Sequence, residues 1–344
     1  MIIEVSRDDL RVTRAVERPA EPGPGQAAFA VERFALTSNN VTYAAHGVDM
    51  RYWDFFSAPG EWGVVPVWGF GRVTASNVEG LEIGERFYGY WPMADAVVLT
   101  PVKVTRRGFV DGAAHRSELA AVYNGYGRAT DLPGDEALHM LFRPLYVTSF
   151  LLDLACGDGG TAVLSSASSK TAMGLAHALK ARGGWTVIGL TSERNLGFVE
   201  ATGLYDSVAL YDEVDGLKVA GRNVYVDFAG DGAVRAAVHN RFADALASSI
   251  VVGDTHWEVS GAGQPLPGPR PEFFFAPTIM AERLAEWGQA GFDERLAVGW
   301  QGFTAAVAPW LRVVAVEGVE AARASWTRMA SGDVDPAEGL VVRV

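Results

Sequence analysis

The chain has 344 residues, 49% of them hydrophobic, which exceeds the size at which one core stops growing and so predicts two domains. It carries 29 basic and 41 acidic residues, for a net charge of −12 with no block of like charge. This balance argues against a nucleic-acid partner and against binding to an anionic membrane surface, because both need a basic patch.

The first residues and the single cysteine indicate in which cellular compartment the protein is expected. Residues 1–12, MIIEVSRDDLRV, alternate charge with strand character, whereas a signal peptide needs a basic start and an unbroken apolar core. No run reaches 18 consecutive apolar residues, so we expect no membrane-spanning helix. One cysteine, Cys156, excludes internal disulfides and multi-cysteine metal sites. We therefore expect a soluble protein of the reducing cytoplasm.

Short β-type runs separated by turn residues fill the chain from Met1 to about Leu141. The expected strands are Met1–Val5, Ala28–Ala35, Trp62–Val73, Arg86–Tyr90 and Ala96–Pro101. Their spacing predicts an all-β barrel or sandwich.

Helices and strands alternate from about Leu145 to Ile250, which is the pattern of a parallel, doubly wound α/β sheet. The expected helices are Leu145–Ala155, Lys170–Arg182, Arg194–Ala201 and Ala233–Arg241. The expected strands are Ala162–Ser165, Thr186–Leu190, Ser207–Leu210, Asn223–Asp227 and Ser249–Gly253. Two further strand-like runs, Arg312–Val316 and Gly339–Val344, could rejoin the first domain.

A turn of small residues opens the first helix of this α/β region. Residues 162–191 read AVLSSASSKTAMGLAHALKARGGWTVIGLT, a strand, a turn, a helix and a strand at nucleotide-binding length. The N–H groups and the dipole at such a helix start attract a diphosphate when the backbone can come close. Serine or alanine replaces each glycine of the usual fingerprint, and a capped polar turn explains SSASSK equally well. The candidate diphosphate contacts are Ser166, Ser168, Ser169, Lys170 and Thr171.

The residues after the second strand of this region bear on which dinucleotide is bound. An acidic residue there accepts from the ribose 2′-OH of NAD, whereas a 2′-phosphate needs hydroxyl groups and a cation. The candidates are Thr191, Ser192, Arg194 and Asn195, with Lys170 adding charge from the facing loop. They favour NADPH over NADH, although Glu193 could be an acidic ribose ligand one turn late.

The order of the segments resembles the medium-chain dehydrogenase/reductase superfamily. Residues 81–101, LEIGERFYGYWPMADAVVLTP, are similar to a recurring strand pair of that superfamily, and SNNVTY at 38–43 lies where zinc-free quinone-reductase members place a substrate segment. The phrases SNNVTY, RYWDFF, PVWGF, YGYWPMA and GDTHW resemble a bacterial branch known only as a domain of unknown function. The resemblance implies a β-rich, GroES-like domain of residues 1–140 with 290–344, a Rossmann domain of residues 141–289, and a homodimer.

The same resemblance implies further cofactor contacts at the carboxyl ends of strands and in the run that would hold the carboxamide. These candidates are Phe228, Ala229, Gly253, Thr255, His256 and Phe275. A capped loop or a buried strand explains several of them as well.

Departures from the superfamily argue against zinc. PVWGF at 66–70 stands near the position of the Gly-His-Glu segment, and the ligand cysteines are missing. The six histidines show no i, i+3 or i, i+4 pairing. Three nitrogen or sulfur ligands are needed for catalytic zinc, so hydrogen-bond donors must polarise the substrate instead.

Tyr43 and Asn40 are the leading catalytic candidates, followed by Tyr123 with Tyr126, and then by Tyr90 and His46. A tyrosine with the ordinary pKa near 10 can protonate a developing enolate. Packing of an aromatic core is the alternative for these tyrosines. A cleft lined by so many aromatic residues would suit a planar or apolar small molecule.

These observations favour a zinc-independent, NADPH-dependent oxidoreductase acting on an activated C=C bond, a quinone or a carbonyl. The alternative is a non-catalytic sensor or accessory protein with weak or no dinucleotide binding. A methyltransferase is a third reading, because Cys156-Gly157-Asp158-Gly159-Gly160 is glycine-rich, although its position favours a helix C-cap and linker.

Overall fold

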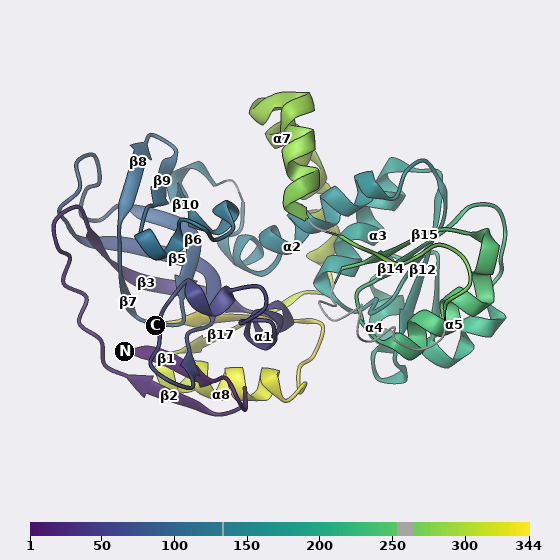
Figure 1. Ribbon diagram of the computed structural model, residues 1–344, viewed down its shortest axis with the longest axis horizontal. Coiled ribbons are helices and arrows are strands. Elements are labelled where there is room, and N and C mark those ends of the chain that lie inside the picture. The colour runs from purple at the N-terminus through teal and green to yellow at the C-terminus, as the bar shows by residue number, and fades with distance from the viewer. Residues whose placement is uncertain (133, 253–264, 275) are drawn as a thin grey trace. The chain divides into compact units, whose positions relative to one another are not determined.

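Figure 1 shows the computed structural model, which describes residues 1–344 apart from 133, 253–264 and 275. The chain forms two compact units: unit 1 comprises Met1–Leu141 with Arg312–Val344, and unit 2 comprises Phe142–Leu311. Among the described residues, no helix combines the length and the apolar character that a bilayer crossing needs.

Unit 1 is built mainly of β-strands. Its strands are β1 (Ile2–Ser6), β2 (Thr13–Val16), β3 (Ala27–Leu36), β4 (Trp62–Gly63), β5 (Pro66–Ser76), β6 (Arg86–Pro92), β7 (Ala96–Leu99), β8 (Pro101–Thr105), β9 (Gly108–Asp111), β10 (Gly125–Arg128), β17 (Arg312–Glu317) and β18 (Glu338–Arg343). They form a small sheet, β2-β1-β4, and a large one, β17-β18-β3-β5-β6-β10-β9-β8, in which β7 also pairs with β3. This arrangement confirms the predicted β-rich domain.

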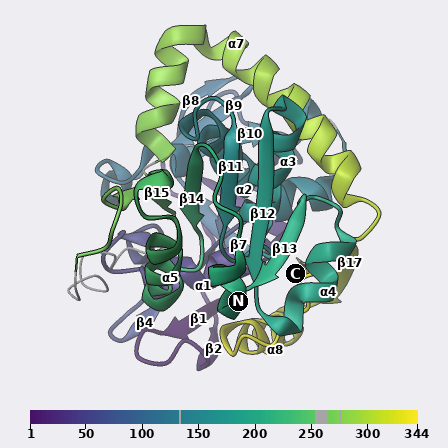
Figure 2. The same cartoon turned by 90° about the vertical axis from the view of Figure 1, so that its right-hand side faces the viewer.

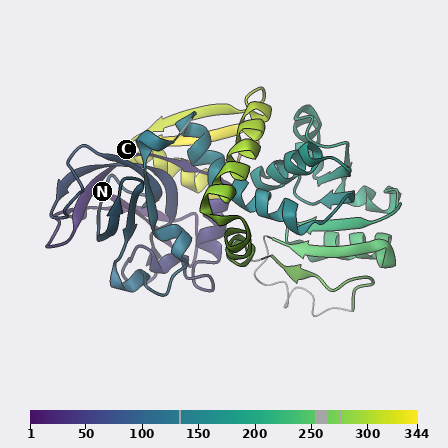
Figure 3. The same ribbon diagram turned by 90° about the horizontal axis from the view of Figure 1, so that it is seen from above.

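Short helices connect these strands. They are α1 (Ser38–Ala45), α8 (Val319–Ala330) and the 3-10 turns η1 (Tyr52–Asp54), η2 (Ala114–Arg116), η3 (Ala121–Asn124) and η4 (Ala129–Asp131). The last strand, β18, pairs antiparallel with β3, and Trp326 of α8 donates a hydrogen bond to Leu10 O. Both chain ends therefore belong to unit 1, as Figures 1 and 3 show, and the predicted return of the C-terminal strands is confirmed.

The predicted strand Trp62–Val73 is two strands. β4 pairs with β1 in the small sheet, whereas β5 lies between β3 and β6 in the large one. Val64 and Val65 between them are fully buried, so the apolar character that suggested one strand continues through the break.

Unit 2 alternates strands with helices. Its strands are β11 (Gly160–Leu164), β12 (Trp185–Thr191), β13 (Ser207–Leu210), β14 (Asn223–Asp227), β15 (Leu246–Val251) and β16 (Glu272–Phe273). Its helices are α2 (Glu136–Ala155), which begins in unit 1, α3 (Lys170–Arg182), α4 (Glu193–Ala201), α5 (Gly232–Phe242) and α7 (Ala276–Val307), with 3-10 turns η5 (Tyr211–Gly216) and η6 (Ala243–Ala245).

The strands of unit 2 are all parallel and lie in the order β13-β12-β11-β14-β15-β16. Figure 2 shows the first five of them side by side. This is the strand order of a doubly wound dinucleotide-binding sheet. Alternate residues of β11 enter two cores: Ala162 and Leu164 pack with residues of α2, α3 and α4, while Val163 packs with residues of α5 and η5. Helices thus cover both faces, as the α/β pattern predicts.

Two boundaries differ from those expected. The helix that was predicted to begin at Leu145, directly after Pro144, begins at Glu136. Pro144 lies inside α2 and does not mark its start. The expected return to the first domain at residue 290 occurs at Arg312. The reason is that α7 packs within unit 2, where Phe303 stacks on Tyr146 at a ring-centroid distance of 4.9 Å and Phe292 contacts Phe150 at 5.7 Å.

Candidate functional site

The strand order of unit 2 reverses between β11 and β14. From β11 the chain moves to β12 and β13 on one side, and then returns to β14 and β15 on the other. In open α/β sheets, ligands bind beyond the carboxyl ends of the strands at such a switch point. The serine-lined turn, residues 165–169, directly follows β11 and so lies there.

Ser165 ties the ends of these two strands together. Its hydroxyl donates to Asp227 Oδ1 over 2.8 Å and accepts from the backbone N–H groups of Phe228, at 2.9 Å, and Ala229, at 3.0 Å. Ser165 and Asp227 are both fully buried. Ser165 was not among the predicted contacts, because the first glycine of the fingerprint corresponds to Ser166. Its position directly after an apolar strand was the sequence signal for it.

Arg235 supports the same network from α5. Its Nε donates to Asp227 Oδ2 over 2.9 Å, and both side chains are almost completely buried. Asp227 Oδ1 also accepts from the N–H groups of Ala229 and Gly230, both at 3.1 Å. A buried carboxylate paired in this way fixes the carboxyl end of β14 and, through Ser165, the start of the turn.

Ser166 adopts a left-handed conformation with φ of 48° at the position where the fingerprint has a glycine. A side chain in this region costs free energy, so surrounding bonds must hold it. The Ser166 N–H donates to the Tyr211 hydroxyl over 3.1 Å, and Ser166 O accepts from the Ser169 N–H at 2.8 Å. Tyr211, at the carboxyl end of β13, is a second residue that sequence reasoning missed.

The turn passes close to β12. A Cβ on Gly189 would lie only 2.8 Å from Ala167 Cβ, so this contact needs a glycine. The Ala167 N–H donates to Leu190 O over 3.0 Å, and Ala167 O accepts from the Tyr205 hydroxyl at 2.7 Å. The small residues therefore let the turn lie against the sheet.

Two serines of the turn present hydroxyl groups at the start of α3. Ser169 is the N-cap of α3, and its Oγ accepts from the Ala172 N–H over 3.3 Å. Ser168 Oγ accepts from Asn195 Nδ2 over 3.1 Å. Because each oxygen acts as acceptor here, each O–H can still donate to a phosphate oxygen. The structure thus brings Asn195 to Ser168, which precedes Ser169 in the turn.

The predicted cationic residues are placed differently. Lys170 Nζ lies 5.6 Å from the centre of the Phe142 ring on α2. Arg194 is exposed in the first turn of α4, beside exposed Glu193 and after the N-cap Ser192. Thr191, the last residue of β12, is buried. Lys170 thus lies against an aromatic ring of α2, whereas Arg194 is exposed on α4.

The remaining predicted cofactor contacts divide into two groups. Phe228 and Ala229 follow β14, and their N–H groups bond to Ser165, so both lie at the switch point. Thr171 is half-buried in the first turn of α3. Gly253, Thr255, His256 and Phe275 lie outside the described residues.

The glycine-rich segment 156–160 forms a linker between α2 and β11. Arg222 donates to Cys156 O at 2.8 Å and to Gly159 O at 3.1 Å, and Arg182 donates to Gly157 O at 2.7 Å. Burial raises the pKa of the Cys156 thiol to about 12. These bonds explain the segment as the capped end of a helix.

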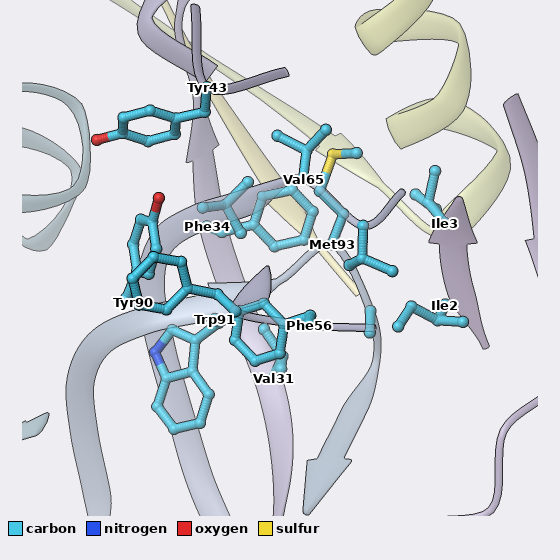
Figure 4. Close-up of a cluster of buried hydrophobic side chains, with 14 of the residues drawn as sticks. Ile2, Ile3, Val31, Phe34, Tyr43, Phe56, Val65, Tyr90, Trp91 and Met93 are labelled. Carbon is cyan, nitrogen blue, oxygen red and sulfur yellow. The ribbon is translucent and has the colours of Figure 1, made fainter. Parts of the chain in front are cut away.

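Unit 1 gathers the candidate catalytic residues into one aromatic group. Tyr43 from α1, Tyr52 from η1, Tyr90 from β6 and Tyr123 from η3 form what we name the tyrosine cluster. Ring centroids lie 4.5 Å apart for Tyr43 and Tyr52, 4.6 Å for Tyr90 and Tyr123, and 5.7 Å for Tyr43 and Tyr90. Alternation along β6 places Tyr90 in the cluster and Trp91 on the opposite side, as Figure 4 shows.

Hydrogen bonds join several hydroxyls of the cluster. The Tyr52 and Tyr123 hydroxyls are 3.2 Å apart, and Trp68 Nε1 donates to the Tyr43 hydroxyl over 3.3 Å. Trp68 faces Tyr90 across the β5–β6 pair. Trp68 and Tyr123 are half-buried, whereas Tyr43 is only 5% exposed. The spacing of the tyrosines in sequence did not reveal the contributions of Tyr52 and Trp68.

Burial changes the acid–base behaviour expected of these phenols. It raises the pKa of Tyr43 well above the ordinary value near 10, with a further contribution from the negative charge that Tyr52 would carry. Burial likewise raises the pKa of Tyr52, Tyr90 and Tyr123. The assumption of an unshifted tyrosine pKa is therefore wrong here. At neutral pH all four groups are protonated hydrogen-bond donors.

Asn40 has a structural role. Its Oδ1 accepts from Thr37 N at 2.7 Å and Thr37 Oγ1 at 3.2 Å, and its Nδ2 donates to Pro66 O at 3.0 Å. These bonds close the N-terminal capping box of α1 and attach the helix to β5. Both the oxygen and the nitrogen of this buried amide are hydrogen-bonded within the protein. This geometry favours a role in positioning α1 over contact with a substrate.

Within the residues that the structure describes, His, Cys, Asp and Glu side chains form no group of three placed to hold a metal ion. The candidate residues form two separate groups, the serine-lined turn of unit 2 and the tyrosine cluster of unit 1.

Comparisons with known proteins agree with this architecture. Residues 34–335 match the model of a family described as "Protein of unknown function (DUF2855)". No curated protein matches the sequence.

Solved structures of similar fold cover nearly the whole chain. CurA from Vibrio vulnificus, in complex with NADPH, has a TM-score of 0.60 at 15% identity, covering 97% of this chain and 94% of its own. The quinone oxidoreductase from Coxiella burnetii has a TM-score of 0.60 at 15% identity, with 100% and 98% coverage. A probable oxidoreductase from Mycobacterium abscessus has a TM-score of 0.59 at 17% identity, with 100% and 98% coverage. This chain therefore shares its overall fold with these solved structures.

Proposed function

The chain belongs to the family described as "Protein of unknown function (DUF2855)", and from this membership and its fold we propose that it is a zinc-independent, NADPH-dependent oxidoreductase. Its substrate would be a planar or apolar small molecule: a compound with an activated C=C bond, a quinone, or a carbonyl compound. The observation that carries the proposal is the serine-lined turn held at the switch point of a doubly wound sheet. NADPH in complex with CurA, and the quinone oxidoreductase of similar fold, support it.

The turn fits the diphosphate of a dinucleotide in three respects. Its residues 165–169 carry no side chain larger than serine, it opens the 13-residue helix α3, and its backbone is fixed by Ser165 and Tyr211. A helix N-terminus attracts anionic oxygens through its N–H groups and dipole. Ser168 and Ser169 would add hydroxyl donors.

Residues at the ends of β12 and β13 fit an adenosine that carries a 2′-phosphate. Ser192 and Arg194 begin α4, and Asn195 connects α4 to Ser168 of the turn. Arg194 is exposed and positively charged, which suits a phosphate better than a ribose hydroxyl. Tyr211, bonded to the turn, would border the same end of the cofactor.

Catalysis in this proposal needs a hydride, which bound NADPH supplies, and a proton from the protein. Tyr43 is the proposed proton donor, because its phenol is protonated at neutral pH and Trp68 Nε1 donates a hydrogen bond to its oxygen. Tyr123 contacts the same group of rings and is the second candidate. The single cysteine and the missing Gly-His-Glu segment are the sequence basis for proposing a zinc-independent enzyme.

A second candidate function is a dinucleotide-binding sensor without turnover. The near-complete burial of Tyr43 favours it, because a proton donor must reach its substrate. The strained Ser166 also differs from the glycine of active superfamily members.

Removal of the Arg194 charge tests the cofactor preference. We expect Arg194→Ala to weaken NADPH binding about tenfold and to leave NADH binding unchanged, because a charged hydrogen bond to the 2′-phosphate contributes about 1.5 kcal/mol or more. Titration followed by tryptophan fluorescence measures both dissociation constants.

Arg295→Ala is the matched control, since Arg295 is an exposed arginine that bonds Gly291 O within α7. Equal loss of NADPH affinity in both variants, or an equal loss for NADH in Arg194→Ala, would contradict the assignment of Arg194.

A further inference from the structure

The Tyr90 hydroxyl is buried without a partner in the tyrosine cluster. Tyr90 is 0% exposed, and none of the described residues forms a hydrogen bond with its hydroxyl. In Figure 4 this hydroxyl points from β6 toward Tyr43. The other three phenols of the cluster each have a hydrogen-bonded neighbour.

An unpartnered buried hydroxyl destabilises the fold, because it has lost its hydrogen bonds to water. Phenylalanine would fill the same space, since the Tyr90 ring already packs on Phe55, Trp68 and Tyr123. The packing of unit 1 therefore gives no reason for the oxygen atom. A ligand that accepts a hydrogen bond from the Tyr90 hydroxyl would explain why tyrosine rather than phenylalanine occupies this position.

We propose that Tyr90 donates a hydrogen bond to the carbonyl oxygen of a flat, conjugated substrate, and so joins Tyr43 in a site for a developing oxyanion. This inference rests on the proposed function and names its substrate class more closely. Neutral phenols in a water-poor site stabilise an oxyanion because their dipoles are already in place.

The chemistry places the new charge on that oxygen. With the hydride that bound NADPH would supply on becoming NADP⁺, addition to the β-carbon of a conjugated carbonyl breaks the C=C π bond, and the electron pair moves to the carbonyl oxygen as an enolate. Tyr43 then gives its proton to the enolate, and the resulting Tyr43 phenolate regains a proton from water. Tyr90 keeps its own proton throughout, since burial and the neighbouring phenols raise its pKa well above the ordinary value.

Binding of 4-nitrophenol without cofactor tests the inference. Its phenolate resembles an enolate oxygen on a flat conjugated ring and absorbs visible light, so a spectrophotometric titration gives its dissociation constant. We expect Tyr90→Phe to weaken binding about tenfold or more, because a hydrogen bond to a charged oxygen is lost. We also expect its urea midpoint to equal or exceed that of the wild type, because the unpartnered hydroxyl is removed.

Tyr88→Phe is the matched control. Tyr88 lies two residues earlier on β6, and its hydroxyl donates to His139 O over 3.0 Å. This variant should bind 4-nitrophenol as the wild type does. Equal binding by Tyr90→Phe and the wild type, no binding by the wild type, or a lower urea midpoint in Tyr90→Phe would overturn the inference. NADPH titration of the same proteins reports on the proposed function separately.

Discussion

Tyr43→Phe should lower turnover by about 10²- to 10⁴-fold and leave the dissociation constant of NADPH unchanged, because the variant loses only the proton donor. Its ring would still pack on Tyr52, whose centroid lies 4.5 Å away. The measurement is NADPH oxidation at saturating concentrations of a quinone or enone that the wild type reduces, with NADPH binding titrated in parallel.

The pH dependence gives a second test of Tyr43. Because burial raises its pKa, the folded protein keeps the phenol protonated, and the turnover that depends on this proton should not fall until the pH exceeds the ordinary tyrosine value near 10. Stability from this buried phenol is likewise lost only as the pH rises above 10. A wild-type rate in Tyr43→Phe would remove Tyr43 from the mechanism, whereas binding of NADPH without any turnover by the wild type would favour the sensor.

Arg116→Met should lower the free energy of unfolding by about 3 to 5 kcal/mol, the usual effect of leaving a buried charge without its partner. Arg116 Nε lies 3.1 Å from Asp111 Oδ2, and both side chains are 2% exposed. The guanidinium also donates to Phe55 O at 3.2 Å and to the Tyr126 hydroxyl at 3.4 Å. Urea unfolding followed by tryptophan fluorescence measures the change.

The control for Arg116 is Arg11→Met, which breaks an exposed ion pair with Asp9. Solvent screens such pairs, so its urea midpoint should match that of the wild type. Arg116 also supports the tyrosine cluster, because the Phe55 ring beneath its guanidinium contacts Tyr90 at a centroid distance of 5.3 Å. Equal unfolding free energies for Arg116→Met and Arg11→Met would show that the buried pair contributes nothing.

The sequence predicted the α/β alternation of unit 2 because each strand and helix there has its own periodicity. The helix at Lys170–Arg182 was predicted with its observed bounds, since Ser169 caps its start and Gly183, with φ of 81°, ends it. The extent of α7 in unit 2 was not predictable locally. It depends on ring contacts between Phe303 and Tyr146, which are far apart in the chain.

The sequence predicted which segments form the candidate site, but it did not predict the hydrogen bonds and ring contacts within them. A small-residue turn after an apolar strand indicated residues 165–169, but the bond from Ser165 to Asp227 joins positions 62 residues apart. Tyr43 and Tyr123 were selected by residue type. Only their packing showed that their pKa values are raised and that Tyr90 and Tyr52 belong to the same group. Asn40 was selected as a catalytic candidate because the segment SNNVTY resembles a substrate segment. Its side chain instead forms the hydrogen bonds that cap α1 and attach it to β5.

The central claim is that the start of α3 binds the diphosphate of NADPH, and a pair of isosteric variants at Ser169 tests it most directly. Asparagine and aspartate both replace serine well as N-caps, so each variant should keep the helix. Calorimetric titration should show that Ser169→Asn binds NADPH nearly as the wild type does, whereas Ser169→Asp binds about tenfold to a hundredfold more weakly, because its carboxylate repels the diphosphate. Equal affinities of the two variants, or a folded wild-type protein that does not bind NADPH, would contradict the claim.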